Sequence, residues 1–146
     1  FDYKQAKVIV DFGHNADAVK AIVEAVNIFP ANRRSVVICG TGDRRDEDLR
    51  ALTRNIGHAF DDAILFEDAC QRGRSDGEVI ALLREGLQGA TRVTTIEDVY
   101  GEFKAIDRAL EKLQAGDVCL ILIDQIQESM AHVQMRMHEA PTSAKV

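Results

Sequence analysis

Short apolar runs alternate with longer amphipathic stretches along this chain, and this alternation is the feature that most limits the folds available to it. Several of the short runs are rich in valine and isoleucine, and they cover residues 7–10, 36–39, 63–66, 92–96 and 118–123. Runs of this length without polar alternation are typical of strands that are buried on both faces. The stretches that follow these runs repeat apolar residues with the period of a helix. Four of them cover residues 18–29, 46–59, 77–87 and 125–137.

The clearest helical stripe follows the fourth run and consists of Val99, Phe103, Ile106, Leu110 and Leu113. Thr95 and Asp98 have the spacing of a capping box at the start of this helix. Five strand–helix units in succession predict a parallel sheet, because each crossover helix returns the chain to the same end of the sheet. We therefore predict an α/β fold that is three-layered, doubly wound and Rossmann-like, with a mostly parallel sheet of five to six strands.

Length and charge exclude several classes of protein. The 146 residues are the size of one domain, which we expect to span residues 1–140 and to be followed by a disordered tail at 141–146. No apolar run approaches the roughly 20 residues that cross a bilayer, so we expect no membrane partner. The 18 Lys and Arg residues face 24 Asp and Glu residues, a net charge of -6 that disfavours a nucleic-acid partner.

The cysteines and the first residues bear on location and completeness. Cys39, Cys70 and Cys119 have no CxxC spacing, and this pattern is typical of free thiols in a reducing cytosol, so we expect a cytoplasmic protein. The chain starts at Phe1 without a signal-peptide pattern or an initiator methionine, as a fragment of a longer protein would.

Three segments that follow predicted strands carry the chemistry, and the first spans residues 11–17. Asp11 can accept hydrogen bonds from vicinal hydroxyls such as those of ribose, and His14 and Asn15 offer mixed donors and acceptors. The alternative is structural: Asp11 ends a strand, and Asn15 or Asp17 caps the next helix. We keep both interpretations open.

The second segment, residues 40–48, combines glycines with Arg44 and Arg45. Either guanidinium can hold a carboxylate or phosphate through two hydrogen bonds. The alternative is a solvated helix start, which explains the acidic residues 46–48 but not two arginines at the positive end of a helix. The sequence contains no GxxxxGK[ST] P-loop, so the chain has no complete mononucleotide site of its own.

The third segment, residues 67–76, mixes the acidic Glu67 and Asp68 with Arg72 and Arg74. It is long for a strand-to-helix connection, and its charges suit an amino-acid zwitterion, with arginines for the carboxylate and acids for a basic group. The alternative is a flexible surface loop whose charges pair with one another.

At these segments the chain resembles the C-terminal domain of the Mur ligase superfamily, whose members join a carboxyl group to an amine with ATP. Residues 11–16 resemble the Asp-Tyr/Gly-Ala-His-Asn-Pro turn of that superfamily, with Ala16 in place of proline, and residues 42–46 resemble its Gly-Asp-Arg-Asp motif. Within the superfamily, residues 42–48, 67–74 and 116–125 are similar to the cyanophycin synthetase family. Ile123-Asp124-Gln125 replaces the Gly-Lys-Gly-His-Glu stretch of the peptidoglycan ligases.

The resemblance implies roles for individual residues. Asp11 would hold the ATP ribose, His14 and Asn15 would line the nucleotide cleft, and Arg44, Asp68 and Arg72 would position the incoming amino acid. It implies that the P-loop and metal ligands belong to a preceding central domain of the same polypeptide. ATP and Mg would then be bound mainly outside this chain, to which we assign no catalytic residue and no metal ligand.

The partners expected from the resemblance are that central domain, an amino acid substrate and an acidic acceptor. Three other functions stay open: another Mur-type ligase of folylpolyglutamate or peptidoglycan type, a degenerate ligase domain kept for assembly, and a stand-alone binding or regulatory module. A receiver-type module would need a lysine after the fifth strand, where the chain has Asp124-Gln125. Assembly into a homo-oligomer also stays open.

Overall fold

The strands form one sheet. They are β1 (Asp2–Tyr3), β2 (Ala6–Asp11), β3 (Arg34–Ile38), β4 (Asp62–Glu67), β5 (Thr95–Tyr100) and β6 (Val118–Leu122). This computed structural model describes residues 1–12, 15–41, 44–67 and 73–139. In these ranges the six-stranded sheet has the order β1-β2-β6-β3-β4-β5. The strands from β2 onward pair in parallel, whereas β1 pairs antiparallel with β2.

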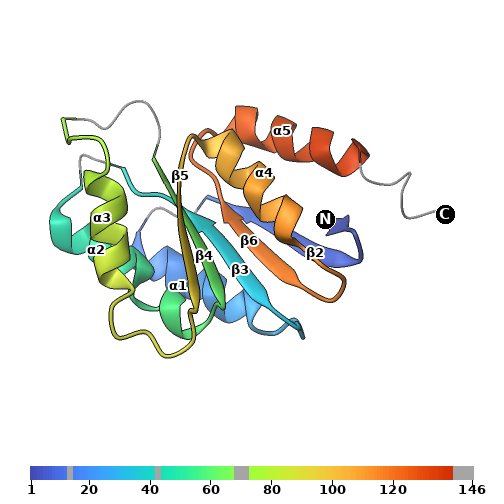
Figure 1. The fold of residues 1–146 in the computed structure, drawn as a ribbon, viewed down its shortest axis with the longest axis horizontal. Helices are drawn as coiled ribbons and strands as arrows, with labels where there is room; N and C mark the ends of the chain where they lie inside the picture. The colour runs from blue at the N-terminus through green and yellow to red at the C-terminus, as the bar shows by residue number, and fades with distance from the viewer. Residues whose placement is uncertain (13–14, 42–43, 68–72, 140–146) are drawn as a thin grey trace.

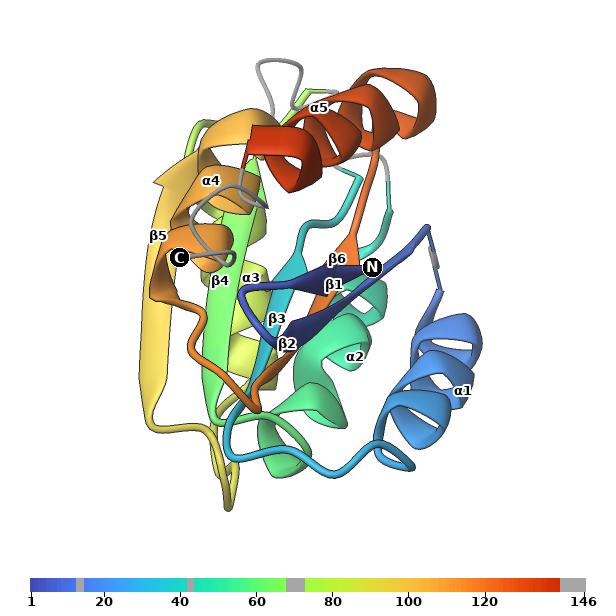
Figure 2. The ribbon, with the colours of Figure 1, turned by 90° about the vertical axis from the view of Figure 1, so that its right-hand side faces the viewer.

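Helices cover both faces of the sheet (Figure 1). They are α1 (Ala16–Val26), α2 (Asp46–Arg54), α3 (Glu78–Gly86), α4 (Glu102–Lys112) and α5 (Ile126–Glu139), with a short 3-10 turn η1 (Ile56–His58) after α2. One apolar core lies between the sheet and α1 to α3, and a second lies between the sheet and α4 and α5. Figure 2 shows α4 and α5 on the side opposite to α1 and α2. The predicted three-layer, mostly parallel α/β fold is thereby confirmed.

The inner residues of β3 and β4, 36–38 and 63–66, are apolar because both faces of the sheet are covered. Val36 and Ile38 of β3 contribute to the core under α1 to α3, whereas Val37 between them contributes to the core under α4 and α5. In β4, Leu65 and Phe66 alternate in the same way, and all six residues of this strand are buried.

The boundary between β5 and α4 differs from the prediction. Thr95 and Asp98 lie within β5, so the predicted capping box is wrong, and α4 begins after Gly101, whose φ is +107°. Val99 fits the helical stripe by its spacing but packs against the core from the strand. The sequence pattern also does not predict β1, a two-residue strand that joins β2 through the turn Lys4-Gln5.

Helices α2 and α3 approach each other closely at Gly86. A Cβ atom on this residue would lie 2.1 Å from the carbonyl oxygen of Arg50 and 2.1 Å from the hydroxyl oxygen of Thr53. The Thr53 hydroxyl donates a hydrogen bond of 2.5 Å to the carbonyl oxygen of Leu83, which restricts its movement. We expect Gly86→Ala to lower the free energy of unfolding by about 2 to 3 kcal/mol, because the added methyl group forces the helices apart. Urea unfolding measures this loss. The exposed Gln88→Ala should stay within about 0.5 kcal/mol of the parent, and equal losses in the two variants would contradict the packing argument.

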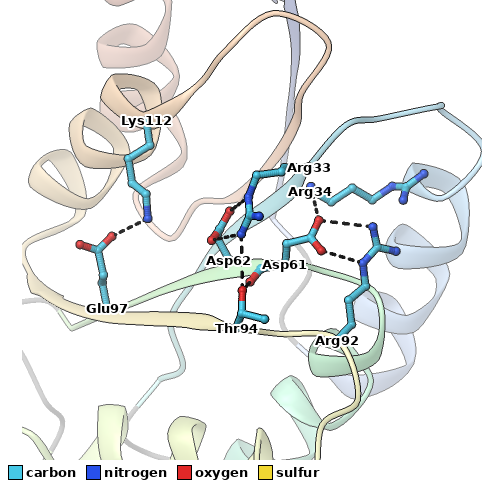
Figure 3. A network of polar contacts seen from close by, with 8 residues as sticks. All are labelled: Arg33, Arg34, Asp61, Asp62, Arg92, Thr94, Glu97 and Lys112. Carbon is cyan, nitrogen blue, oxygen red and sulfur yellow. Dashed lines mark hydrogen bonds and ion pairs between the residues drawn. The ribbon is translucent and has the colours of Figure 1, made fainter.

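A polar network joins the amino-terminal ends of the central strands (Figure 3). Asp61 accepts hydrogen bonds from the backbone N–H of Arg34 at 2.8 Å and from Nε and Nη2 of Arg92 at 3.1 and 3.3 Å. The neighbouring Asp62 accepts from Nε and Nη2 of Arg33 at 3.0 and 2.8 Å. These contacts hold together the starts of β3 and β4 and the segment that leads into β5.

The pKa of Asp61 lies below that of an ordinary aspartate. Burial alone would raise this pKa, but the hydrogen bonds from Arg92 and Arg34 and the positive charge of Arg92 lower it by more. A carboxyl group with a lowered folded-state pKa stabilises the fold above its unfolded pKa, and this contribution is lost as the pH falls through the folded pKa. The difference in unfolding free energy between the parent and Asp61→Asn should therefore be constant above about pH 5 and shrink below about pH 4. Urea titrations of both proteins over this range measure the difference, and a value independent of pH would contradict the assignment.

Candidate functional site

The strand order decides which loops are neighbours at the end of the sheet formed by the carboxyl ends of the parallel strands, here termed the carboxyl edge (Figure 1). Because β6 lies between β2 and β3, residues 123–125 separate the segment after β2 from the segment after β3. The backbone N–H of Ile123 donates to the carbonyl oxygen of Asp11 at 2.8 Å. Open α/β sheets bind ligands at their carboxyl edge, where the strand order changes direction. The described residues 11–12, 15, 41 and 44–45 belong to this region.

Asp11 is the last residue of β2, and Asn15 precedes α1. One carboxylate oxygen of Asp11, Oδ1, accepts a hydrogen bond from the backbone N–H of Phe12 at 2.7 Å. Among the described residues, its Oδ2 has no hydrogen-bond donor. The Asn15 side chain accepts from the backbone N–H of Ala18 at 2.9 Å and so caps α1. Both parts of the structural alternative are therefore present, since Asp11 ends β2 and Asn15 caps α1. The contact between Asp11 and a hydroxyl donor such as ribose stays a prediction.

A hollow of about 270 Å³ lies beside Asp11, between β2 and α1. Ile9, Ile22, Val26 and Phe29 line it, so that the carboxylate is the charged group in a largely apolar wall. Apolar surface with one well-placed polar group is the usual character of a small-molecule site.

Arg44 and Arg45 lie at the start of α2 but have different surroundings. Arg45 is the residue before the helix, its side chain is 85% exposed, and it pairs with Asp48 at 3.1 Å. Arg44 is partly buried, and its backbone N–H donates to the carbonyl oxygen of Thr41 at 3.1 Å. Within the part of the chain that the structure describes, the guanidinium of Arg44 makes no hydrogen bond or ion pair. The predicted contact between Arg44 and a carboxylate or phosphate stays a prediction.

Arg74 joins the segments after β3 and β4. Its side chain is only 15% exposed, and it pairs with Asp46 at 2.8 Å and with Glu78. Its Nη2 also donates to the carbonyl oxygen of Arg44 at 2.6 Å. Hydrogen bonds from Arg74 to Glu78 and Asp46 raise the pKa of its guanidinium above the ordinary value for arginine. These contacts favour a bracing role for Arg74, because they already engage its guanidinium with two carboxylates and a carbonyl group.

Glu67 lies at the carboxyl edge and has a buried structural role that its residue type does not predict. It ends β4, is 3% exposed, and accepts hydrogen bonds from the backbone N–H groups of Gly77 at 2.8 Å and Ile80 at 3.0 Å. A carboxylate at a helix start satisfies free N–H groups and complements the positive end of the helix. Glu67 thus fixes the start of α3 against the end of β4. Its place directly after the apolar run of residues 63–66 is the signal that could have identified it.

Three predicted site residues, His14, Asp68 and Arg72, lie outside the described residues. In the described ranges, no group of three or more His, Cys, Asp or Glu residues is arranged to hold a metal ion. The same ranges contain no helix that is both long and apolar enough to cross a membrane.

The sequence profile of the family described as Mur ligase, glutamate ligase domain, matches residues 2–122. The chain is 32% identical over 134 residues to a cyanophycin synthetase of Geminocystis herdmanii, a match that covers 92% of this chain and 15% of that protein. It is 30% identical over 136 residues to a cyanophycin synthetase of Crocosphaera subtropica, covering 93% of this chain and 16% of the relative. The chain therefore spans about a sixth of the length of these curated relatives.

Solved structures share the fold. A UDP-N-acetylmuramoyl-L-alanyl-D-glutamate–2,6-diaminopimelate ligase superposes with a TM-score of 0.72 at 18% identity, covering 90% of this chain and 30% of that one. E. coli FolC in complex with ADP superposes with a TM-score of 0.67 at 21% identity, covering 88% of this chain and 29% of FolC. The profile match, the cyanophycin synthetase relatives and the shared fold agree, and the chain belongs to the Mur ligase family as its glutamate ligase domain.

Proposed function

We propose that this chain is the C-terminal domain of an ATP-dependent carboxylate–amine ligase of the cyanophycin synthetase type. In such a reaction ATP supplies a phosphoryl group that converts the acceptor carboxylate into an acyl phosphate, and the amine of an amino acid then displaces phosphate. The named relatives and the FolC complex with ADP support this proposal. The observation that carries it is the placement of Asp11 and Arg44 on opposite sides of the β6 end at one carboxyl edge.

On the amine side, Arg44 binds the α-carboxylate of the incoming amino acid. A guanidinium with no partner among the described residues offers a charge-assisted, two-pronged contact of the kind that orients carboxylates. Arg74 donates a hydrogen bond to the carbonyl oxygen of Arg44 and so holds the backbone of Arg44 in place. We extend the amine side to Asp68 and Arg72 on the resemblance, and to Arg45 because its guanidinium follows the same strand as that of Arg44.

On the nucleotide side, Oδ2 of Asp11, which has no donor among the described residues, accepts a hydrogen bond from a ribose hydroxyl, and the apolar hollow beside it borders the nucleotide. His14 completes this side by resemblance, and Asn15 contributes by fixing the start of α1. Because the chain lacks a P-loop, we assign the phosphates and Mg to a preceding central domain of the same polypeptide.

Four exposed apolar side chains lie at the carboxyl edge and support closure against that central domain. Phe12 is 50% exposed, Tyr100 57%, Phe103 40% and Ile126 44%, and each lies at or next to the end of a strand or the start of a helix at this edge. Closure over these residues buries apolar surface and excludes water from an acyl phosphate that hydrolyses readily. We propose that residues 1–140 form the closing domain and that the enzyme acts in the cytosol.

The proposal is tested by amino-acid-dependent phosphate release. The full-length polypeptide that contains this chain is incubated with ATP, Mg, an acidic acceptor and one amino acid from a panel of arginine, lysine, glutamate and diaminopimelate. We expect one amino acid to stimulate both phosphate release and amide formation, and the isolated chain to do neither. Robust turnover by the isolated chain, or none by the full-length protein with any amino acid of the panel, would contradict the proposal.

A further inference from the structure

A buried glutamate from one helix holds the start of another at the carboxyl edge. Glu102 is the first residue of α4 and is 2% exposed. Its carboxylate accepts hydrogen bonds from the backbone N–H of Asp124 at 3.0 Å, from the backbone N–H of Gln125 at 3.2 Å, and from the hydroxyl of Ser129. All of these donors belong to the segment after β6 or to the first turn of α5, whereas Glu102 itself follows β5.

These contacts answer two requirements of the fold. The first N–H groups of a helix have no partner within the helix, and a carboxylate complements the positive end of the helix. Burying a carboxyl group is costly unless several donors reach it, and here three do. A side chain of α5 could cap this helix without a buried charge-bearing group. The tertiary contact does more, because it fixes the position of α5 relative to α4 and to the sheet.

The segment that Glu102 holds lies in the middle of the candidate site. Residues 123–125 follow β6, which runs between β2 and β3, and Ile123 donates to the carbonyl oxygen of Asp11 at 2.8 Å. Asp124 is partly buried and Gln125 is exposed. A displacement of this segment would therefore change the spacing between Asp11 on one side and Arg44 on the other.

We propose that Glu102 is a positioning residue for ligation. It acts through the backbone N–H groups of residues 124–125, which it holds in place. This fixes the distance between the nucleotide side at Asp11 and the amine side at Arg44. This role rests on the proposed function, since it is ligation that requires the nucleotide side and the amine side at a fixed distance. The role does not require Glu102 to touch either substrate, and the burial of its side chain agrees with this.

Glu102→Gln in the full-length protein tests the inference, because it keeps the side-chain volume but turns an NH₂ group toward backbone donors. Asp61→Asn is the matched control, since it removes a carboxylate that also accepts from a backbone N–H but lies at the opposite end of the strands. We expect both variants to be less stable than the parent. Only Glu102→Gln should lower kcat/KM for the amino acid, by about 10- to 100-fold, because small displacements of reacting groups cost this much. Hydrogen exchange should show faster amide exchange at residues 123–126 in this variant and not in the control.

The possible outcomes separate the positioning role from the proposed function. Parent-like kinetics in Glu102→Gln, with a stability loss like that of Asp61→Asn, would overturn the positioning role and leave Glu102 as a structural cap. A parent protein without amino-acid-dependent turnover would overturn the proposed function, and the positioning role with it. A selective loss of kcat/KM together with faster local exchange would support the inference.

Discussion

Arg44→Ala in the full-length protein is expected to lower kcat/KM for the amino acid by about 30- to 150-fold. The loss corresponds to about 2 to 3 kcal/mol, the contribution of a hydrogen-bonded contact between charged groups. The physical reason is that the guanidinium of Arg44 has no hydrogen-bond or ion-pair partner in the described ranges, so its binding energy is available to a substrate carboxylate. Arg44→Lys should give an intermediate loss, because an ammonium keeps the charge but not the two-pronged geometry.

Arg54→Ala provides the matched control for this experiment. Arg54 lies at the far end of the same helix, is 55% exposed and pairs with Glu47 at 2.6 Å. Steady-state rates with the amino acid varied and ATP saturating distinguish the two arginines. Equal kinetics for the Arg44 and Arg54 variants, or an Arg44 effect confined to the KM for ATP, would remove Arg44 from the amine side.

Asp11→Asn is expected to raise the KM for ATP by about 10-fold or more, because it replaces one carboxylate oxygen by an NH₂ group at the position proposed for ribose. The substitution retains an oxygen for the N–H of Phe12, so the turn itself should persist. The parent protein should prefer ATP over 2′-deoxy-ATP or 3′-deoxy-ATP, and this preference should be weaker in the variant. Comparing the nucleotides in both proteins isolates the contact between Asp11 and ribose.

Asp17→Asn is the control for this prediction, since Asp17 is an exposed acidic residue in the first turn of α1, the helix that follows β2. Its replacement should leave the KM for ATP and the nucleotide preference unchanged. If Asp11→Asn retained the parental preference for the ribose hydroxyls, Asp11 would be a turn residue only.

The layers of the fold could be predicted from the sequence, because short apolar runs and helical stripes alternate without interruption. The boundary of α4 could not, since Val99 satisfies the period of a helix and also the inward face of a strand. Gly101, with its φ of +107°, is the residue that ends the strand, and its conformation is visible only in three dimensions. The position of β6 between β2 and β3 could not be predicted from the sequence either, because it depends on which strands pair across the sheet.

The candidate site could be predicted as a set of loops but not as a set of free side chains. In the sequence, Arg44 and Arg74 look alike, yet the fold brings two carboxylates and a carbonyl group to Arg74. Glu67 and Glu102 look like surface acids, and only the packing of α3 and α5 shows that their carboxylates hold helix starts. Tertiary partners far apart in the chain decide these roles, and residue type and spacing do not contain that information.

Hydroxylamine trapping tests most directly whether this domain presents the amine, because hydroxylamine intercepts an acyl phosphate without needing an amino-acid site. The full-length protein and its Arg44→Ala variant are incubated with ATP, Mg and acceptor, with either hydroxylamine or the amino acid, and hydroxamate and amide are measured. We predict that the variant forms hydroxamate at a rate within about twofold of the parent while amide formation falls by at least about 30-fold. Equal losses of hydroxamate and amide, or undiminished amide formation, would contradict the assignment of Arg44 to the amine side.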